Sequence, residues 1–346
     1  MVRFDFSQNE YILNFINYGK KNQNMNYITV FSLKILKKIY SKISKRGLQK
    51  PECEKDPEKV STLMLDILNK DSPAMIARFG AFELSTVYNY IGVKKGNKKI
   101  LSYLKGNSPQ WWWNEKLLQH LKINAGFFPI NSKSVAKYCE LTIEDMKQVD
   151  ILGSWLIEES FFIDRLSKAV FVQREIQNPF FTKEPWTKAL RGKKVLVIHP
   201  FDELIQKQYL SKRDKLFENP DVLPEFTLKT LKAVQSIGGS SDQFDNWFSA
   251  LDWMKSEMDK TDYDICLIGC GAYGFSLAAH AKRQGKKAVH LGGSLQLLFG
   301  IIGKRWENPN YNENYNYAAL INEYWIRPGE QEKPKGSKLV EDACYW

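Results

Sequence analysis

The sequence contains few of the residues that build metal centres and disulfide frameworks. Only 5 cysteines and 4 histidines occur among its 346 residues. The cysteines are scattered, odd in number and nowhere spaced as Cys-x-x-Cys, which argues against a structural zinc site or a set of disulfides. Such cysteine usage fits a reducing compartment, so we expect a cytoplasmic location.

Long hydrophobic runs are also absent. The longest uncharged stretch near the N-terminus, residues 22–33, is far shorter than the ~20 apolar residues that a membrane-spanning helix needs. Arg3, Asp5 and Glu10 interrupt the apolar region that a signal peptide requires. We therefore expect neither a spanning helix nor a signal peptide.

Positive charge is in excess, but it is concentrated at one end of the chain. The formal net charge is +11. The first 50 residues contain ten basic and two acidic residues and carry +8, which leaves only +3 for the other 296. This distribution argues against a polyanion-binding surface over the whole protein. A hydrophobic fraction of 43% and an aromatic fraction of 13% are ample for a sizeable core.

The basic end contains an amphipathic segment, residues 27–45, in which large apolar side chains recur at three- and four-residue steps. They are Ile28, Phe31, Ile35, Ile39 and Ile43, and lysines occupy much of the remaining surface. The pattern is typical of a helix on an anionic membrane surface, formed by residues 27–46. It is also typical of a surface helix packed on its own domain with a solvated lysine face. Nucleic acid is not expected as a partner, because no aromatic side chains are interleaved for base stacking.

Beyond residue 145, short apolar stretches alternate with helical patterns. Continuous apolar strands separated by helices are typical of a parallel sheet covered on both faces. We therefore predict an α/β fold with a doubly wound, mostly parallel, Rossmann-like sheet behind an N-terminal helical extension. The expected parts are the extension over 1–50, a first α/β part over 51–190 and a nucleotide-binding part over 191–346.

The same patterns place the individual elements. Strands are predicted over residues 74–77, 149–153, 169–172, 195–198, 230–237, 264–268 and 288–291. Helices are predicted over residues 57–69, 83–90, 202–216, 247–258 and 276–283. Residues 94–107, rich in lysine, glycine and asparagine, are expected to form loops, and a helix is expected to begin at Trp111-Trp112-Trp113.

Four predicted strands end in residues suited to binding or chemistry. In open parallel sheets, ligands bind beyond the carboxyl ends of the strands. The four ends are Arg78-Phe79-Gly80, His199-Pro200-Phe201, Gly269-Cys270-Gly271-Ala272-Tyr273-Gly274 and His290-Leu291-Gly292-Gly293. His199 is a candidate base or acceptor contact, although a structural histidine also fits this position.

The third of these ends is a Gly-x-Gly-x-x-Gly motif between a predicted strand and a predicted helix. Its glycines allow close approach to a pyrophosphate, and the helix N-terminus offers free N–H groups and partial positive charge. In nicotinamide dehydrogenases an acidic residue about 20 positions later binds the ribose hydroxyls, but the next strand here ends in Gly292-Gly293. We expect a diphosphate cradle of another kind, with a tight turn that binds nothing as the alternative.

The segment Met75-Ile76-Ala77-Arg78-Phe79-Gly80-Ala81-Phe82-Glu83 resembles the RFGDGE-type segment of the GT-D glycosyltransferases, bacterial enzymes that transfer sugars from nucleotide-sugar donors. Residues 264–293 are similar to that family's strand, glycine-rich turn, helix and second strand. The resemblance implies a nucleotide-sugar donor, expected to be UDP-linked. The residues expected to bind the donor are Gly80, Gly269, Gly271, Ala272, Tyr273, Gly274, His290, Gly292, Gly293 and Arg305.

The family's Asp-x-Glu pair implies a divalent metal, Mn²⁺ or Mg²⁺, that bridges the donor's phosphates. This chain has Ala81-Phe82-Glu83, so only the second carboxylate is present, and one carboxylate is a poor ligand set for either ion. Glu83 is expected to hold the metal through waters, to act as general base or to bond a sugar hydroxyl. Arg78 is expected to bind the diphosphate and replace the missing metal charge, with a salt bridge to a nearby carboxylate as the alternative.

Together, the resemblance and the strand-end residues indicate a glycosyltransferase of bacterial surface-polysaccharide or glycoconjugate assembly. The expected catalytic residues are Glu83, Arg78 and His199, and the acceptor is a glycan, glycolipid or glycoprotein. A lipid-linked acceptor would suit an enzyme held at the inner face of the plasma membrane by its basic helix. An NAD(P)-dependent oxidoreductase and a non-catalytic adaptor on a membrane surface are the alternatives.

Overall fold

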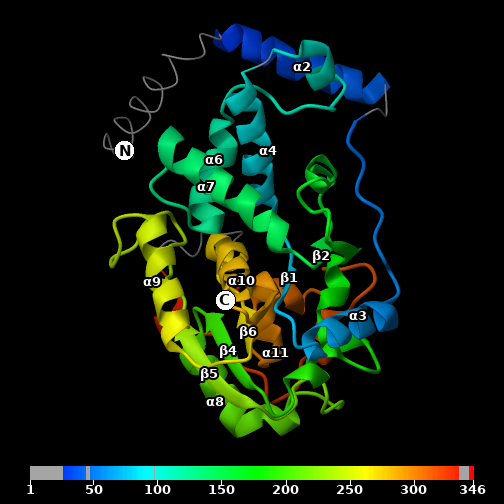
Figure 1. Cartoon of the computed structure of the whole chain (residues 1–346), viewed down its shortest axis with the longest axis vertical. Helices are drawn as coiled ribbons and strands as arrows, with labels where there is room; N and C mark the ends of the chain where they lie inside the picture. The colour runs from blue at the N-terminus through cyan, green and yellow to red at the C-terminus, as the bar shows by residue number, and fades with distance from the viewer. Residues whose placement is uncertain (1–25, 44–46, 97, 335–342) are drawn as a thin grey trace.

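The computed structural model describes residues 26–43, 47–96, 98–334 and 343–346. Its centre is a seven-stranded sheet in which all pairings are parallel, in the order β3-β2-β1-β7-β6-β4-β5 (Figure 1). This confirms the predicted α/β fold with a parallel, Rossmann-like sheet. The strands are β1 (Ala74–Ala77), β2 (Ile151–Ser154), β3 (Val170–Gln173), β4 (Lys194–His199), β5 (Thr227–Lys232), β6 (Ile265–Ile268) and β7 (Lys287–His290).

Helices cover both faces of the sheet because its central strands are apolar on both sides. In β1, Met75 packs in one core cluster and its neighbour Ile76 packs in the other. The first cluster includes side chains from α4 (Ala81–Lys95), α6 (Glu115–Ala125), α7 (Ser132–Asp145), α9 (Trp247–Lys260) and α10 (Gly274–Arg283). The second includes side chains from α3 (Pro57–Asn69), α8 (Asp202–Lys212) and α11 (Leu295–Leu298).

Short polar residues determine where several helices begin. Asp56 accepts two backbone N–H hydrogen bonds at the start of α3, and Pro57 occupies the first helical position. Asn114, Asn131 and Asn246 cap α6, α7 and α9 in the same manner. The cap at Asn114 places the start of α6 at Glu115, after the three tryptophans.

The predicted helix start at Trp111 is therefore wrong, and so is the prediction of loops throughout residues 94–107. Residues up to Lys95 belong to α4, and α5 (Ile100–Leu104) lies inside the remaining segment. Trp111 and Trp112 are buried with Tyr103 of α5 and Leu33 in a small third cluster. The tryptophans serve as core residues for this cluster, which a local helical pattern does not reveal.

The predicted strand at residues 230–237 is displaced toward the C-terminus from the observed strand. β5 ends at Lys232, and the apolar residues Ala233 and Val234 are buried in the connection that follows it. β5 is an edge strand, and none of its side chains is fully buried. Its own hydrophobicity is therefore weak, and the apolar residues beyond its end gave the stronger signal.

Strands from both expected α/β parts join in the one sheet, since β1 to β3 come from residues 51–190 and β4 to β7 from residues 191–346. The join is the pairing of β1 with β7, in which Met75 lies beside Ala288. The division at residue 190 stays a prediction. No helix in the described part of the chain is long and apolar enough to cross a membrane.

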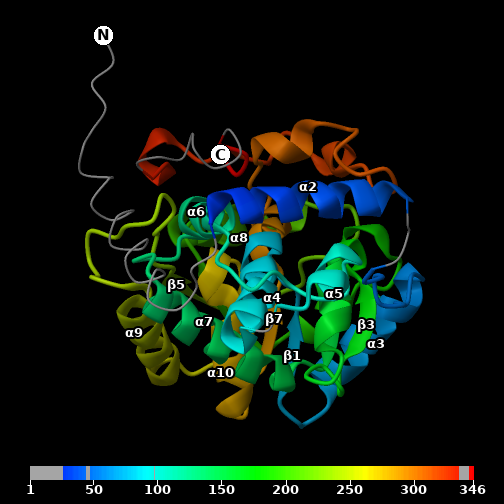
Figure 2. The same cartoon turned by 90° about the horizontal axis from the view of Figure 1, so that it is seen from above.

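The expected basic helix is present as α2 (Tyr27–Ile43), and residues 44–46 lie outside the described residues. α2 lies at one end of the long axis of the molecule, beyond the helices that cover the sheet (Figure 1). Seen from that end, it lies beside α5 (Figure 2), with which it is in contact.

Candidate functional site

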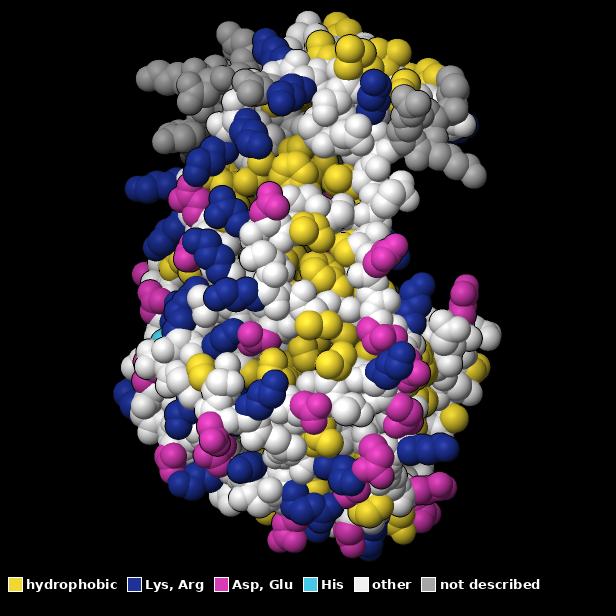
Figure 3. All heavy atoms as spheres, turned by 45° about the vertical axis from the view of Figure 1, so that its right-hand side comes forward, with side chains coloured by type: hydrophobic (Ala, Val, Ile, Leu, Met, Phe, Trp, Pro, Cys, Tyr) yellow, Lys and Arg dark blue, Asp and Glu magenta, His cyan; other side chains and the backbone are white. Residues whose placement is uncertain are grey.

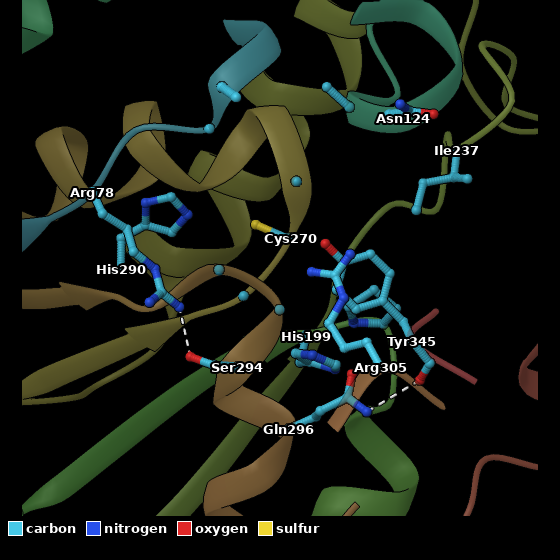
Figure 4. A pocket seen from close by; sticks show the side chains of 18 of the residues that line it. Arg78, Asn124, His199, Ile237, Cys270, His290, Ser294, Gln296, Arg305 and Tyr345 are labelled. Atoms are coloured by element: carbon cyan, nitrogen blue, oxygen red, sulfur yellow. Dashed lines mark hydrogen bonds between the residues drawn. The ribbon is translucent and has the colours of Figure 1, made fainter. Parts of the chain in front are cut away.

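A cavity of about 400 Å³ lies at the carboxyl edge of the sheet. The four strands whose ends were singled out from the sequence, β1, β7, β6 and β4, are consecutive neighbours in the sheet. Their parallel direction brings Arg78, His290, Gly269 and His199 to one edge, where all four line this strand-end cavity. Figure 4 shows the side chains of Arg78, His199 and His290 there. The rule that ligands bind beyond parallel strand ends therefore predicts which residues meet.

The glycine motif forms the turn between β6 and α10, and its three positions require glycine for different structural reasons. A Cβ at Gly269 would lie 2.6 Å from the carbonyl oxygen of Gly292, and one at Gly274 would lie 2.3 Å from Nε2 of His290. Close packing of the β6 turn against the β7 end therefore requires both glycines. Gly271 has φ +56, a left-handed conformation that favours glycine.

Ala272 and Gly274 are the two predicted binding residues that do not line the cavity. Both are buried within the turn, and Gly274 faces the imidazole of His290. The other predicted residues do line it. They are Arg78, Gly80, Glu83, His199, Gly269, Gly271, Tyr273, His290, Gly292, Gly293 and Arg305.

Arg78 is a buried cation surrounded by neutral partners. Its Nη2 donates a 2.6 Å hydrogen bond to Ser294 Oγ, which donates in turn to Asn178 Oδ1 at 2.7 Å. Asn178 Nδ2 donates to the hydroxyl of Tyr317 at 2.8 Å. Arg78 forms no ion pair with any carboxylate in the described part of the chain. Burial lowers its pKa to about 10, and the nearby positive charge of Arg174 adds to this effect, so the guanidinium is still protonated at neutral pH.

Two further arginines line the cavity. Arg174 forms an ion pair with Glu175, and its guanidinium carbon lies 3.9 Å from the centre of a Trp155 ring. Arg305 lies over the ring of Tyr345 at 4.7 Å. Figure 4 shows Arg78 and His290 on one side of the cavity and Arg305 with Tyr345 on the other. These cation–π contacts fix the direction of each guanidinium.

Glu83 is the third residue of α4 and folds back over the start of its own helix. A Cβ on Gly80 would lie 2.1 Å from Oε2 of Glu83, so the absence of a side chain at Gly80 makes room for the carboxylate. Burial raises the pKa of Glu83 and is opposed by a hydrogen bond from the backbone N–H of Glu83 itself. A carboxylate with a raised pKa is a stronger proton acceptor than an ordinary glutamate side chain.

The carboxylates of the cavity do not form a ligand set for Mn²⁺ or Mg²⁺. Ala81 stands where a second acidic residue would be needed, and the remaining carboxylate, Glu175, is paired with Arg174. No group of three or more His, Cys, Asp or Glu side chains suited to a metal occurs among the described residues. The residues present therefore do not fit the divalent metal that the resemblance implies.

His199 and His290 are both buried, and burial lowers the pKa of each to about 3. Both are therefore neutral at physiological pH. Nδ1 of His199 accepts a 3.0 Å hydrogen bond from the backbone N–H of Phe201. The proton of the neutral ring is then on Nε2, so His199 is a hydrogen-bond donor rather than a base. Neither ring nitrogen of His290 has a hydrogen-bond partner within the described structure.

Several lining residues were not found from the sequence. Arg174 follows the end of β3 as Arg78 follows the end of β1, so the strand-end rule could have found it. Asn178, Ser294 and Tyr317 come from separate connections and meet only in the folded chain. No local sequence pattern predicts such a hydrogen-bond network.

No protein-family model matches the chain, and no curated protein matches it. A solved structure titled as a selenomethionine-substituted domain of unknown function 1792 (DUF1792) is similar, with 14% sequence identity and a TM-score of 0.34. The match covers 86% of this chain and 99% of that one. A similarity of this size assigns neither a family nor an activity. The fold and the geometry of the site define a parallel α/β protein with an arginine-lined cavity at its strand ends.

Proposed function

We propose that this protein is a glycosyltransferase that binds the diphosphate of a nucleotide-sugar donor in the strand-end cavity. The observation that carries the proposal is Arg78, a buried and protonated guanidinium with only neutral partners. Removing a cation from water is costly unless an anion compensates for it. A bound diphosphate would supply that anion, and guanidinium groups bind phosphate oxygens through paired hydrogen bonds.

The size and charge of the cavity support this class of ligand. A volume of about 400 Å³ is within the range of small-molecule sites, roughly 300–1,000 Å³. Among the described residues, three arginines and two glutamates line the cavity, and the two histidines that line it are neutral. The resulting positive charge favours an anionic ligand at the end of the sheet.

The chemistry that we propose uses this chain's own side chains. An acceptor hydroxyl attacks the anomeric carbon of the donor sugar, and the bond from that carbon to the β-phosphate oxygen breaks. The hydroxyl proton passes to the carboxylate of Glu83, and the bond electrons leave with the nucleoside diphosphate. Arg78 stabilises the charge that develops on the leaving phosphate, and His199 donates from Nε2 to a ligand oxygen.

An NAD(P)-dependent oxidoreductase is the second candidate, because a glycine-rich turn connects strand β6 to helix α10, the position at which dinucleotide-binding folds hold a pyrophosphate. That function needs an acidic residue at the end of the following strand to bind the ribose hydroxyls. β7 ends instead at His290 and continues into Leu291, Gly292 and Gly293. The transferase is therefore the better-supported function.

Thermal unfolding with UDP, GDP, CMP and NAD tests the proposal. A ligand at 100 times its Kd stabilises the folded state by about 2.7 kcal/mol. We expect one nucleoside diphosphate to raise Tm even when EDTA removes divalent metal ions. In an activity assay, the protein should then release this nucleoside diphosphate from the corresponding nucleotide sugar. Stabilisation by NAD alone would favour the oxidoreductase. If none of the four ligands stabilises the protein, the cavity does not bind nucleotides of this class, and a non-catalytic adaptor is favoured.

A further inference from the structure

α2 packs on the protein through a small number of side chains around Leu33. Leu33 is buried, and Val30 is partly buried beside it in the third cluster, with Tyr103, Trp111 and Trp112. The ammonium group of Lys37 lies 4.5 Å from the centre of the Tyr103 ring. These contacts fix which side of the helix faces the protein.

The wide apolar side of α2 faces away from the protein. With 3.6 residues per turn, Ile35 points roughly 160° away from Leu33, and Ile28 and Phe31 lie on the same outer side. The exposed fractions on this side are large: Tyr27 80%, Ile28 68%, Phe31 55%, Ile39 50% and Ile35 43%. Leu36, at the edge nearer the protein, is also 49% exposed. A surface helix of a globular protein normally buries its apolar stripe, and α2 has the reverse arrangement.

Positive charge borders this apolar side. Lys34, Lys38 and Lys42 follow one another at four-residue steps and are exposed, so they form a row along one edge of it. α2 contains no acidic residue among its 17. Figure 3 shows hydrophobic side chains gathered at the end of the molecule where α2 lies, with basic side chains next to them.

We propose that the outer side of α2 docks on an anionic lipid bilayer. An apolar stripe that enters the lipid interface beside a row of lysines that reaches anionic headgroups is the arrangement that interfacial helices use. A second copy of this chain fits less well, because pairing through this side would bring two lysine rows together without compensating carboxylates on α2. The inference does not depend on the transferase function.

Vesicle sedimentation of the full chain tests the proposal. The probes are vesicles of phosphatidylcholine alone and vesicles with about one-third phosphatidylglycerol. We expect at least tenfold tighter binding to the anionic vesicles, weakened by 0.5 M salt, because salt screens exposed charges. Equal binding to both compositions, or binding to neither, would overturn the proposal.

Two triple variants assign the binding to α2. Ile28→Ser, Ile35→Ser and Ile39→Ser together should reduce binding at least tenfold. The matched control replaces Ile157, Ile163 and Leu210, which are 46%, 44% and 79% exposed on other elements, by serine and should bind as the wild type does. Because all six side chains are exposed, both variants should unfold at the wild-type temperature.

Charge reversal and oligomeric state complete the test. Lys34→Glu, Lys38→Glu and Lys42→Glu together should abolish the preference for anionic vesicles. Unchanged binding of either α2 variant would show that another surface binds lipid. Light scattering should find a monomer without vesicles, and a dimer that the isoleucine variant separates would assign this side to a second copy instead.

Discussion

Replacement of Arg78 by methionine separates a ligand-binding role from a structural one. Burial lowers the pKa of Arg78 from 12.5 to about 10, so the protonated side chain disfavours folding at every physiological pH. At about 1.4 kcal/mol per pKa unit, this penalty is on the order of 3 kcal/mol. Methionine removes the penalty and also loses the hydrogen bond to Ser294 Oγ, which is worth about 1 kcal/mol.

We therefore expect Arg78→Met to stabilise the protein without ligand by about 2 kcal/mol and to raise Tm by a few degrees. The same change should weaken the binding of the nucleoside diphosphate roughly 10- to 150-fold, because hydrogen bonds to charged groups contribute about 1.5–3 kcal/mol. Such a trade of stability for function is expected where a binding group is held without its partner.

Calorimetric titration and urea unfolding of the same samples measure both effects. Arg191→Met is the matched control, because Arg191 is 59% exposed and pairs with Asp221 on the surface. It should change neither ligand affinity nor stability by more than about 0.5 kcal/mol. If Arg78→Met destabilised the protein and left affinity unchanged, Arg78 would be a structural residue and the reasoning would be refuted.

Three further predictions follow from the cavity. Glu83→Gln should keep diphosphate affinity but slow sugar transfer by about 10²–10⁴-fold, as measured by nucleotide release with acceptor, since it removes the proposed base. His199 and His290 have folded-state pKa values depressed to about 3, so their contribution to stability is complete above pH 6.5 and is lost as pH falls toward 3. Between pH 7 and pH 5, each histidine should lower the free energy of unfolding of the protein by about 2 kcal/mol. In urea titrations, the His290→Gln variant should therefore lose less stability over this pH range than the wild type. Gly269→Ala would place a Cβ 2.6 Å from the carbonyl oxygen of Gly292 and should lower unfolding free energy by about 1–3 kcal/mol, with unchanged stability counting against this packing.

The meeting of the strand ends was predictable because all strands of a parallel sheet end at the same edge. Arg78 directly follows the apolar strand β1, and His199 and His290 are the last residues of two other largely apolar strands. Such strands are recognisable locally. The sheet order is what makes their ends neighbours. The edge strand β5 was placed several residues too late, because its side chains are only partly buried and lack the apolar signal of the central strands.

Other features depend on contacts that no local pattern contains. Trp111 and Trp112 are buried because Tyr103 and Leu33 come to them from other helices. Ser294 and Asn178 become partners of Arg78 through hydrogen bonds across more than 100 residues. The amphipathic pattern of α2 was visible, but only the packing of Leu33 shows that its wide apolar side faces outward.

The charges of the cavity are consistent with the proposed binding of a diphosphate without a metal ion. A metal-dependent site contributes negative carboxylates and obtains its positive charge from the ion. Here Ala81 removes one such carboxylate, Glu175 is neutralised by Arg174, and Arg78 supplies a cation of its own. Ala81 and an Arg78 that forms no ion pair among the described residues are consistent with the proposed direct recognition of a diphosphate by arginine.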